Sequence, residues 1–126
     1  MELLPDAELE VMNVLWDSPG STMTSREVVN ALSDSHVWKI QTVSTFLTRL
    51  CERGFVSKTR TGREINYAAI VDRGEYMSAE ARSFASKHAG FSLKGLVAAF
   101  ADQGTVSERD IHELSAWIEA RRTEDD

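Results

Sequence analysis

A short stretch of the sequence gathers side chains that can hydrogen-bond to bases and phosphates. The residues concerned are Gln41, Thr42, Ser44, Thr45, Thr48 and Arg49. Glutamine can pair with adenine, hydroxyl residues can meet thymine methyl groups or phosphate oxygens, and arginine can take guanine or a phosphate. A second group, suited to neutralising phosphates or entering a minor groove, consists of Lys58, Arg60 and Arg63. These residue types predict contact with double-stranded DNA.

The positive charge of the chain is concentrated in the same stretch. From Lys39 to Arg63 there are six basic residues and one acid, so this segment carries +5 in a chain of net charge -6. Residues 1–37 and 71–126 are both acidic overall. Because phosphate neutralisation supplies most of the sequence-independent affinity for DNA, acidic surroundings favour a weak monomer that gains affinity by pairing.

An amphipathic helix over about Ile40–Arg53 is expected to position the first group. Its apolar residues recur at i, i+3, i+4 and i+7 and form one stripe, which consists of Val43, Phe46, Leu47 and Leu50. At 100° per residue, Gln41, Thr45 and Thr48 fall opposite that stripe. The pattern therefore predicts a buried side and a reading side on one helix.

A β-hairpin is expected to carry the second group. Gly54 can end the helix in a left-handed conformation. Phe55–Arg60 and Glu64–Ile70 have the composition of strands, joined by the glycine-containing loop Thr61-Gly62-Arg63. The three basic residues then lie at or near the tip of the hairpin.

Two further helices are expected before the amphipathic one. Apolar spacing predicts the first over about Pro5–Asp17, and a capping box of Thr24 and Glu27 opens the second, which runs to about Ser33. His36-Val37-Trp38 is too short for a helix and is interpreted as a short strand. Helix, helix, short strand, helix and hairpin is the order of a winged helix-turn-helix, whose third helix enters the major groove.

The remainder of the chain is predicted to be helical and to mediate dimerisation. We expect a long helix from about Asp72 to Ala89, a second over Phe91–Ala101, a third from Ser107 to about residue 122, and a frayed acidic tail from Thr123. The large apolar residues of the last two helices are hard to bury within one subunit, so they indicate an interface rather than a ligand pocket. The predicted interface residues are Phe91, Leu93, Leu96, Val97, Phe100, Ile111, Leu114, Trp117 and Ile118.

The fold class is therefore mainly α with a small β-hairpin. We expect a winged-helix DNA-binding domain over residues 1–70, followed by a helical dimerisation domain over residues 71–126 that ends in the short acidic tail. An alternative hypothesis, supported by the net charge of -6, is a winged-helix protein-interaction module that does not bind DNA.

Two segments of the chain resemble the BlaI/MecI/CopY transcriptional repressors, the penicillinase repressor family. They read LPDAELEVMNVLW and WKIQTVSTFLTRLCERGFVSKTRTGREINY, and a GFSLKGLVAAF segment and a helix beginning SERDIHEL extend the likeness over most of the chain. The resemblance implies a homodimer of winged helices, joined through C-terminal helices, that binds palindromic operator DNA and blocks transcription. Thr45 and Arg49 are the first positions to which it assigns DNA contact.

The sequence departs from that family in two places. In the penicillinase repressors a membrane sensor protease system triggers cleavage of an Asn-Phe bond in the fifth helix, but here Ala99-Phe100 replaces it. The missing asparagine argues against the same signal. Copper-responsive members carry a C-terminal cysteine motif, which Cys51 alone cannot supply.

Several classes of protein are not expected. No Ser-His-Asp set, glycine-rich phosphate loop or paired-carboxylate site indicates an enzyme, and no cofactor is predicted. The spacing of Cys and His predicts no metal site, and Cys51 is interpreted as a packed small residue. Without an apolar run of about 20 residues or a signal peptide, a cytoplasmic location is expected.

Overall fold

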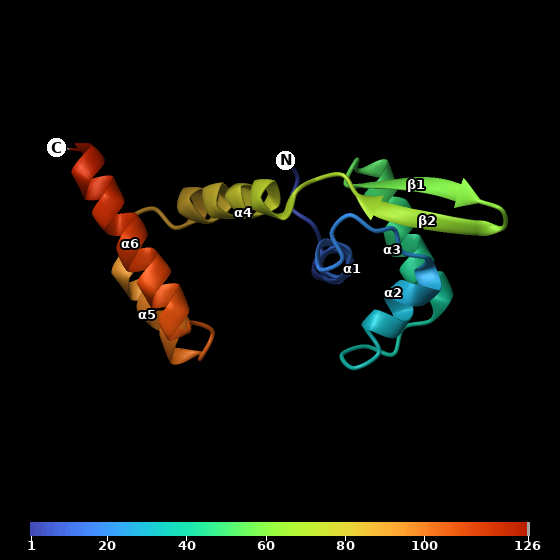
Figure 1. Ribbon diagram of the computed structural model, residues 1–126, viewed down its shortest axis with the longest axis horizontal. Helices are drawn as coiled ribbons and strands as arrows, with labels where there is room; N and C mark the ends of the chain where they lie inside the picture. Colours follow the sequence, from blue (N-terminus) through green and yellow to red (C-terminus); the bar gives the residue numbers. More distant parts are fainter. Residues whose placement is uncertain (126) are drawn as a thin grey trace. The chain divides into compact units, whose positions relative to one another are not determined.

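A computed structural model describes residues 1–125, in which backbone contacts define two compact units, one over Met1–Phe84 and one that begins at Ala85. The described residues form six helices and one hairpin, which Figure 1 labels. Their bounds are α1 Asp6–Trp16, α2 Ser25–Ala31, α3 Ile40–Glu52, β1 Val56–Thr61, β2 Glu64–Ala69, α4 Arg73–Lys87, α5 Leu93–Asp102 and α6 Glu108–Asp125. The predicted fold class, mainly α with a small hairpin, is confirmed.

The core of the first unit is built from α1, α2, α3 and the hairpin. Its central side chains are fully enclosed: Val11, Met12, Val28, Val43, Leu47 and Leu50 are each 0% exposed. The spacing that predicted the stripe on the third helix therefore describes its buried side. Phe46 is half-buried and packs at the margin of the core.

The predicted capping box starts α2. The Thr24 hydroxyl oxygen accepts a hydrogen bond from the Glu27 amide at 3.2 Å, and the Glu27 carboxylate accepts one from the Thr24 amide at 3.1 Å. These bonds satisfy amides that the first helical turn leaves free. The helix ends at Ala31, two residues earlier than expected.

The predicted short strand at His36-Val37-Trp38 is wrong. These residues pair with no strand in the described chain, and the ring of His36 stacks on that of Trp38 with centroids 4.3 Å apart. The extra strand contact lies before α2, where the amide of Met23 donates to the carbonyl oxygen of Tyr67 at 2.9 Å. A single bridge therefore ties the start of the helix-turn-helix to the hairpin.

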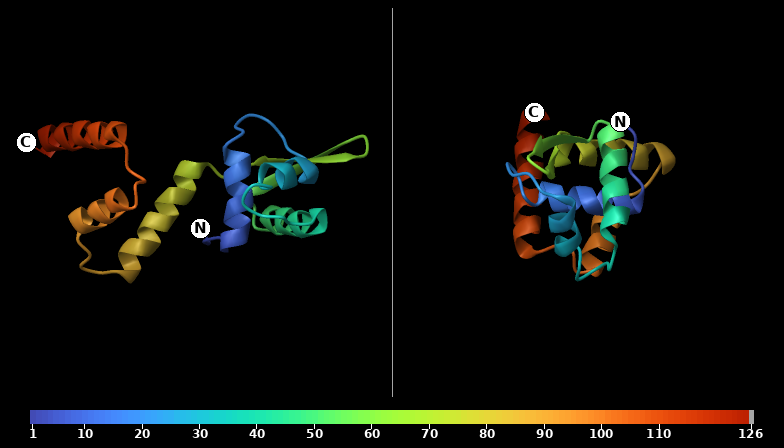
Figure 2. Two further views of the ribbon diagram at one scale, coloured as in Figure 1. Left: turned by 90° about the horizontal axis from the view of Figure 1, so that it is seen from below. Right: turned by 90° about the vertical axis from the view of Figure 1, so that its right-hand side faces the viewer.

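The hairpin projects beyond α2 and α3 in Figure 1 and in the left view of Figure 2. Its two strands are antiparallel, with Val56 opposite Ala69 and Thr61 opposite Glu64. The predicted loop of three residues is one residue too long, because Thr61 belongs to β1 and only Gly62 and Arg63 connect the strands. Gly62 has φ +63°, a left-handed conformation that other residues adopt at a cost.

The N-terminal half of α4 packs on the first unit. Tyr76 is 1% exposed, and its ring lies 5.7 Å from that of Trp16 and 5.9 Å from that of Phe55. The indole nitrogen of Trp16 also donates to the carbonyl oxygen of Val71 at 2.9 Å. These contacts extend the first unit past residue 70, although the functional division of the chain at that residue stays a prediction.

The second unit contains α5 and α6. Ser92 caps α5 by accepting from the Gly95 amide at 3.0 Å, so Phe91 precedes the helix instead of opening it. Ser107 and Asp110 cap α6 reciprocally, at 3.1 and 2.9 Å. α6 continues to Asp125, so the prediction of a frayed tail from Thr123 is wrong for the described residues. No helix within residues 1–125 is long and apolar enough to cross a membrane.

Candidate nucleic-acid interface

The exposed side of α3 carries the polar residues that the sequence assigned to it. Gln41, Thr45, Thr48 and Arg49 are all exposed, whereas Val43, Leu47 and Leu50 on the opposite side are buried. The core therefore fixes the rotation of the helix about its axis. The predicted division into a buried and an exposed side is confirmed, and DNA contact by the exposed residues stays a prediction.

The two threonines of this surface can act as hydrogen-bond acceptors. The hydroxyl of Thr45 donates to the Gln41 carbonyl oxygen, and that of Thr48 donates to the Ser44 carbonyl oxygen, both at 2.9 Å. Because each hydroxyl has one proton, the oxygens retain only lone pairs for a ligand. Amino groups of adenine or cytosine are suitable donors, and the methyl groups suit thymine.

Thr42 and Ser44 are less accessible than their neighbours on α3. Both are half-buried, and the Ser44 hydroxyl donates to the hydroxyl oxygen of Ser25 at 3.0 Å. This bond joins α3 to the first turn of α2. Ser44 thus holds the two helices together, a role that its position in the sequence did not predict.

The basic residues of the hairpin lie on its exposed surface. Lys58 is paired in register with Tyr67 and Arg60 with Ile65, so all four side chains share one face of the sheet. Arg63 lies in the connecting turn. The same face borders a groove that leads to α3.

That groove runs between the hairpin, the start of α2 and the start of α3. Its lining includes Ser25, Arg26, Ile40, Ser44, Arg63 and Ile65. Arg26 was missed in the sequence, where it is the one basic residue of an acidic N-terminal region. The capping box at Thr24 could have identified it, because it places Arg26 in the first turn of the second helix. In a helix-turn-helix that turn lies near the third helix.

In the part of the chain that the structure describes, the cations of α3 and the hairpin are not paired with carboxylates. Within the described residues, Arg49, Lys58, Arg60 and Arg63 make no ion pair. The arginines that do are Arg53, Arg73, Arg109 and Arg122. Cations that are not held by carboxylates remain available to phosphates.

Glu52 is a second residue that the sequence interpretation missed. It lines a shallow depression on α3 together with Ser44, Thr45, Thr48 and Arg49. It lies seven residues after Thr45 and therefore on the same side of the helix, a relation that helical periodicity contains. A carboxylate here can accept from the amino group of cytosine and repels a nearby phosphate.

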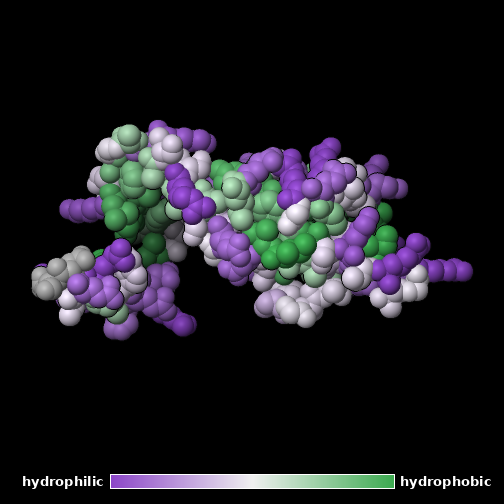
Figure 3. Space-filling view, turned by 90° about the horizontal axis from the view of Figure 1, so that it is seen from above, coloured by the Kyte–Doolittle hydropathy of each residue, from purple (hydrophilic) through white to green (hydrophobic). Residues whose placement is uncertain are grey.

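The predicted interface residues of the second unit are mostly exposed. Leu93 is 66% exposed, Trp117 57% and Phe100 52%, while Leu96 and Val97 are half-buried. An apolar groove between α5 and α6 is lined by Leu93, Lys94, Val97, Ala98, Leu114, Trp117 and Ile118. Figure 3 shows hydrophobic surface in the region of these two helices, at the left of the view.

Cysteine and metal chemistry find no support in this surface. Cys51 is half-buried beside the core, and burial raises the pKa of its thiol while nearby Lys58 opposes that shift. In the described part of the chain, no three His, Cys, Asp or Glu side chains gather as metal ligands.

Comparison with known proteins identifies relatives over nearly the whole chain. The family model described as penicillinase repressor matches residues 4–120. The chain is 30% identical to the penicillinase repressor of Bacillus licheniformis, over 94% of this chain and 91% of the relative. It is 23% identical to the methicillin resistance regulatory protein MecI of Staphylococcus aureus, over 88% and 89% of the two chains.

A solved structure supports the assignment of the first unit. The solution structure of the DNA-binding domain of the repressor BlaI matches with a TM-score of 0.50 at 36% sequence identity. The match covers 58% of this chain and 87% of that domain. The winged helix-turn-helix predicted from the order of elements is confirmed.

Proposed function

The chain belongs to the penicillinase repressor family, and we propose that it represses transcription as a homodimer that binds palindromic operator DNA through α3 and the hairpin. A repressor is a regulator, so the prediction that the chain is not an enzyme is confirmed by the family. Two recognition helices in a symmetric dimer bind half-sites about one or more helical turns apart. Occupation of the operator then blocks transcription by steric exclusion.

One observation carries the DNA-binding part of this proposal. Opposite the buried stripe of α3 lies an exposed surface of hydrogen-bonding side chains and a free arginine, Arg49. The hairpin adds cations without ion pairs beside the same helix. Base edges in the major groove require donors and acceptors on a helix, and phosphates require unpaired cations.

The homodimer is supported by the apolar surface of the second unit. The groove between α5 and α6 is almost entirely apolar, and Leu93 and Trp117 on its walls are more than half exposed. Apolar surface of this extent marks an association site. A second copy fits it, because the half-sites of a palindrome require two copies of the same reading surface.

Release by a sensor protease stays a prediction of the family resemblance. Ala99 and Phe100, which replace the Asn-Phe pair, lie inside α5 and are exposed. Cleavage would require this part of the helix to unwind, and the missing asparagine removes the expected specificity. The proposal therefore requires only that loss of the dimer ends repression.

Selection of DNA from a random duplex pool, followed by salt titration, tests the proposal. The purified chain should retain a palindrome, and the logarithm of its affinity should fall with that of salt by about 0.9 for each phosphate neutralised. The net charge of -6 favours the alternative, an interaction module without DNA binding. Failure to retain any duplex, even at low salt, would contradict the repressor proposal and leave that alternative.

A further inference from the structure

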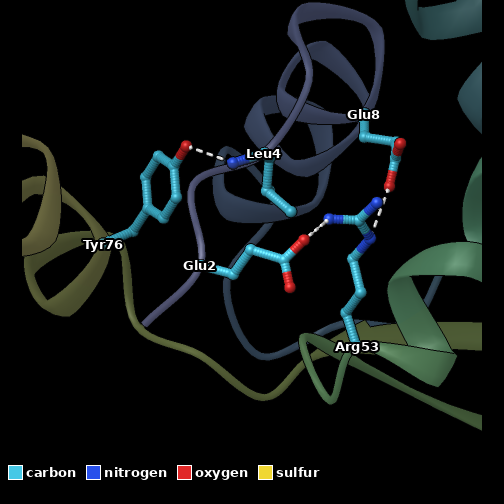
Figure 4. Close-up of polar contacts among 5 residues, drawn as sticks. All are labelled: Glu2, Leu4, Glu8, Arg53 and Tyr76. Atoms are coloured by element: carbon cyan, nitrogen blue, oxygen red, sulfur yellow. Dashed lines mark hydrogen bonds and ion pairs between the residues drawn. The ribbon is translucent and has the colours of Figure 1, made fainter.

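The first residues of the chain connect the end of the recognition helix to α4. Figure 4 shows the guanidinium of Arg53 between the carboxylates of Glu2 and Glu8, and the hydroxyl of Tyr76 directed at the backbone nitrogen of Leu4. We name these five residues the N-terminal clasp. Its members come from the N-terminal segment, α1, the C-terminus of α3 and α4.

The charged half of the clasp holds the end of α3. Arg53 is the C-cap of that helix, and its Nε lies 3.3 Å from Oε1 of Glu8, whose side chain is only 3% exposed. A buried carboxylate is unfavourable unless it is paired. Within the described residues Oε1 of Glu8 makes no hydrogen bond, so the charge of the guanidinium is what compensates its burial. The same guanidinium then pairs with Glu2, a residue of the N-terminal segment.

The uncharged half of the clasp holds α4. The Leu4 amide donates to the Tyr76 hydroxyl at 2.9 Å in a buried position. The ring of Tyr76 packs against that of Phe55, two residues after Arg53. Contacts therefore form a closed circuit from Arg53 through Glu2 and Leu4 to Tyr76, and back through Phe55.

This circuit matters because α4 carries the chain out of the first unit. The unit ends at Phe84, whereas α4 runs from Arg73 to Lys87, so the same helix enters the second unit. In a dimer that binds two half-sites, the spacing between reading helices depends on how each α3 is held relative to its α4. A buried hydrogen bond and a buried ion pair are suited to fixing that relation.

We propose that the N-terminal clasp positions α3 against α4, and so couples the reading surface to the dimer-forming unit. The inference rests on the proposed function, since it assumes a dimer on paired half-sites. Glu2, Arg53 and Tyr76 are positioning residues that act on DNA only through α3. Breaking the clasp should lower the affinity for DNA with two half-sites more than the affinity for DNA with a single half-site.

Tyr76→Phe is the sharpest variant, because it keeps the ring contacts and removes only the hydroxyl. The probes are a palindromic duplex selected by the wild-type chain and the same duplex with one half-site scrambled. Affinity for the palindrome should fall about fivefold or more, with half-site affinity changed by less than about twofold. Ser78→Ala removes an exposed hydroxyl from the same helix, outside both the clasp and the candidate DNA-binding surface, and should leave the ratio of the two affinities unchanged.

Glu2→Gln provides a second variant that cannot disturb the core, because the Glu2 side chain is 71% exposed. It should change the affinity ratio in the same direction by a smaller factor. An unchanged ratio in Tyr76→Phe, or a loss shared equally by both duplexes, would overturn the coupling. If the wild-type chain selects no duplex, the proposed function fails instead.

Hydrogen exchange of the free protein tests the clasp without DNA. In Tyr76→Phe, the amides of the last turn of α3, residues 50–53, should exchange about fivefold faster or more, with those of α2 unchanged. An equal increase throughout the first unit would indicate a general loss of stability and would overturn the inference.

Discussion

The two units of the chain contain similar apolar residues but bury them to different extents. In the first unit, Val43, Leu47 and Leu50 are 0% exposed, whereas none of residues 85–124 is buried in the second unit. Three helices and a hairpin can enclose a core, but α5 and α6 leave one side of each helix uncovered. The first unit therefore has a core of its own, whereas the described residues of the second leave their apolar surface exposed, which supports the proposed dimer.

Truncation of one leucine in each unit should sharpen this comparison most strongly. Leu47→Ala should lower the free energy of unfolding by about 2–5 kcal/mol, because it leaves a cavity in a closed core. Leu93→Ala, at a side chain that is 66% exposed, should cost less than about 0.5 kcal/mol in the monomer. Urea unfolding followed by circular dichroism measures both, at protein concentrations low enough for the chain to be monomeric. Equal losses in the monomer would show that the second unit has a closed core.

A charge in the apolar surface of the second unit should separate the subunits. Phe100→Glu would bury an unpaired carboxylate, and we expect the dimer to weaken about 100-fold or more. Sedimentation equilibrium measures the change. The matched control is Gln103→Glu, which adds the same charge at the C-cap of α5. If the Phe100 variant sediments as the wild-type dimer, Phe100 lies outside the interface.

Removal of the Arg49 side chain should weaken DNA binding by the first unit without lowering its stability. Arg49→Ala should weaken operator binding by about 1–3 kcal/mol, because Arg49 is exposed and makes no ion pair in the described chain. Its melting temperature should stay that of the wild type. Fluorescence anisotropy with the selected duplex measures the affinity. An unchanged affinity would remove Arg49 from the reading surface.

Alkaline pH should produce the smallest effect, through Tyr76. Burial raises the pKa of the Tyr76 hydroxyl, and this effect outweighs the hydrogen bond from the Leu4 amide, which lowers the pKa. Glu80 and Asp6 raise the pKa further. The folded state thus favours the protonated form, and this contribution is complete below the unfolded tyrosine pKa of about 10 and is lost as pH rises above it. Tyr76→Phe should unfold with a weaker dependence on pH above about 10. Identical pH profiles for the two chains would contradict this assignment.

The elements that the sequence predicted correctly depend on neighbouring residues. The capping box of Thr24 and Glu27 spans one helical turn, and the stripe from Val43 to Leu50 spans two. Local hydrogen bonding and helical periodicity determine such features, so their pattern is visible in the chain.

The features that were missed depend on residues far apart in the sequence. Met23 forms a β-bridge with Tyr67. Arg53 pairs with Glu2 and Glu8, which lie near the start of the chain. No local pattern identifies such partners, because the fold brings them together. Glu52 was missed for a different reason. Helical periodicity places it on the exposed polar side of α3, but its negative charge did not suggest a residue of a DNA-binding surface.

Amide chemical shifts in the presence of the selected duplex test the central claim most directly. The claim is that α3 reads DNA with its exposed side and that the hairpin supports it. The largest changes should occur at Gln41, Thr45, Thr48 and Arg49, with a second group at Lys58, Arg60 and Arg63. Changes confined to α5 and α6, or specific binding that leaves α3 unperturbed, would contradict the claim.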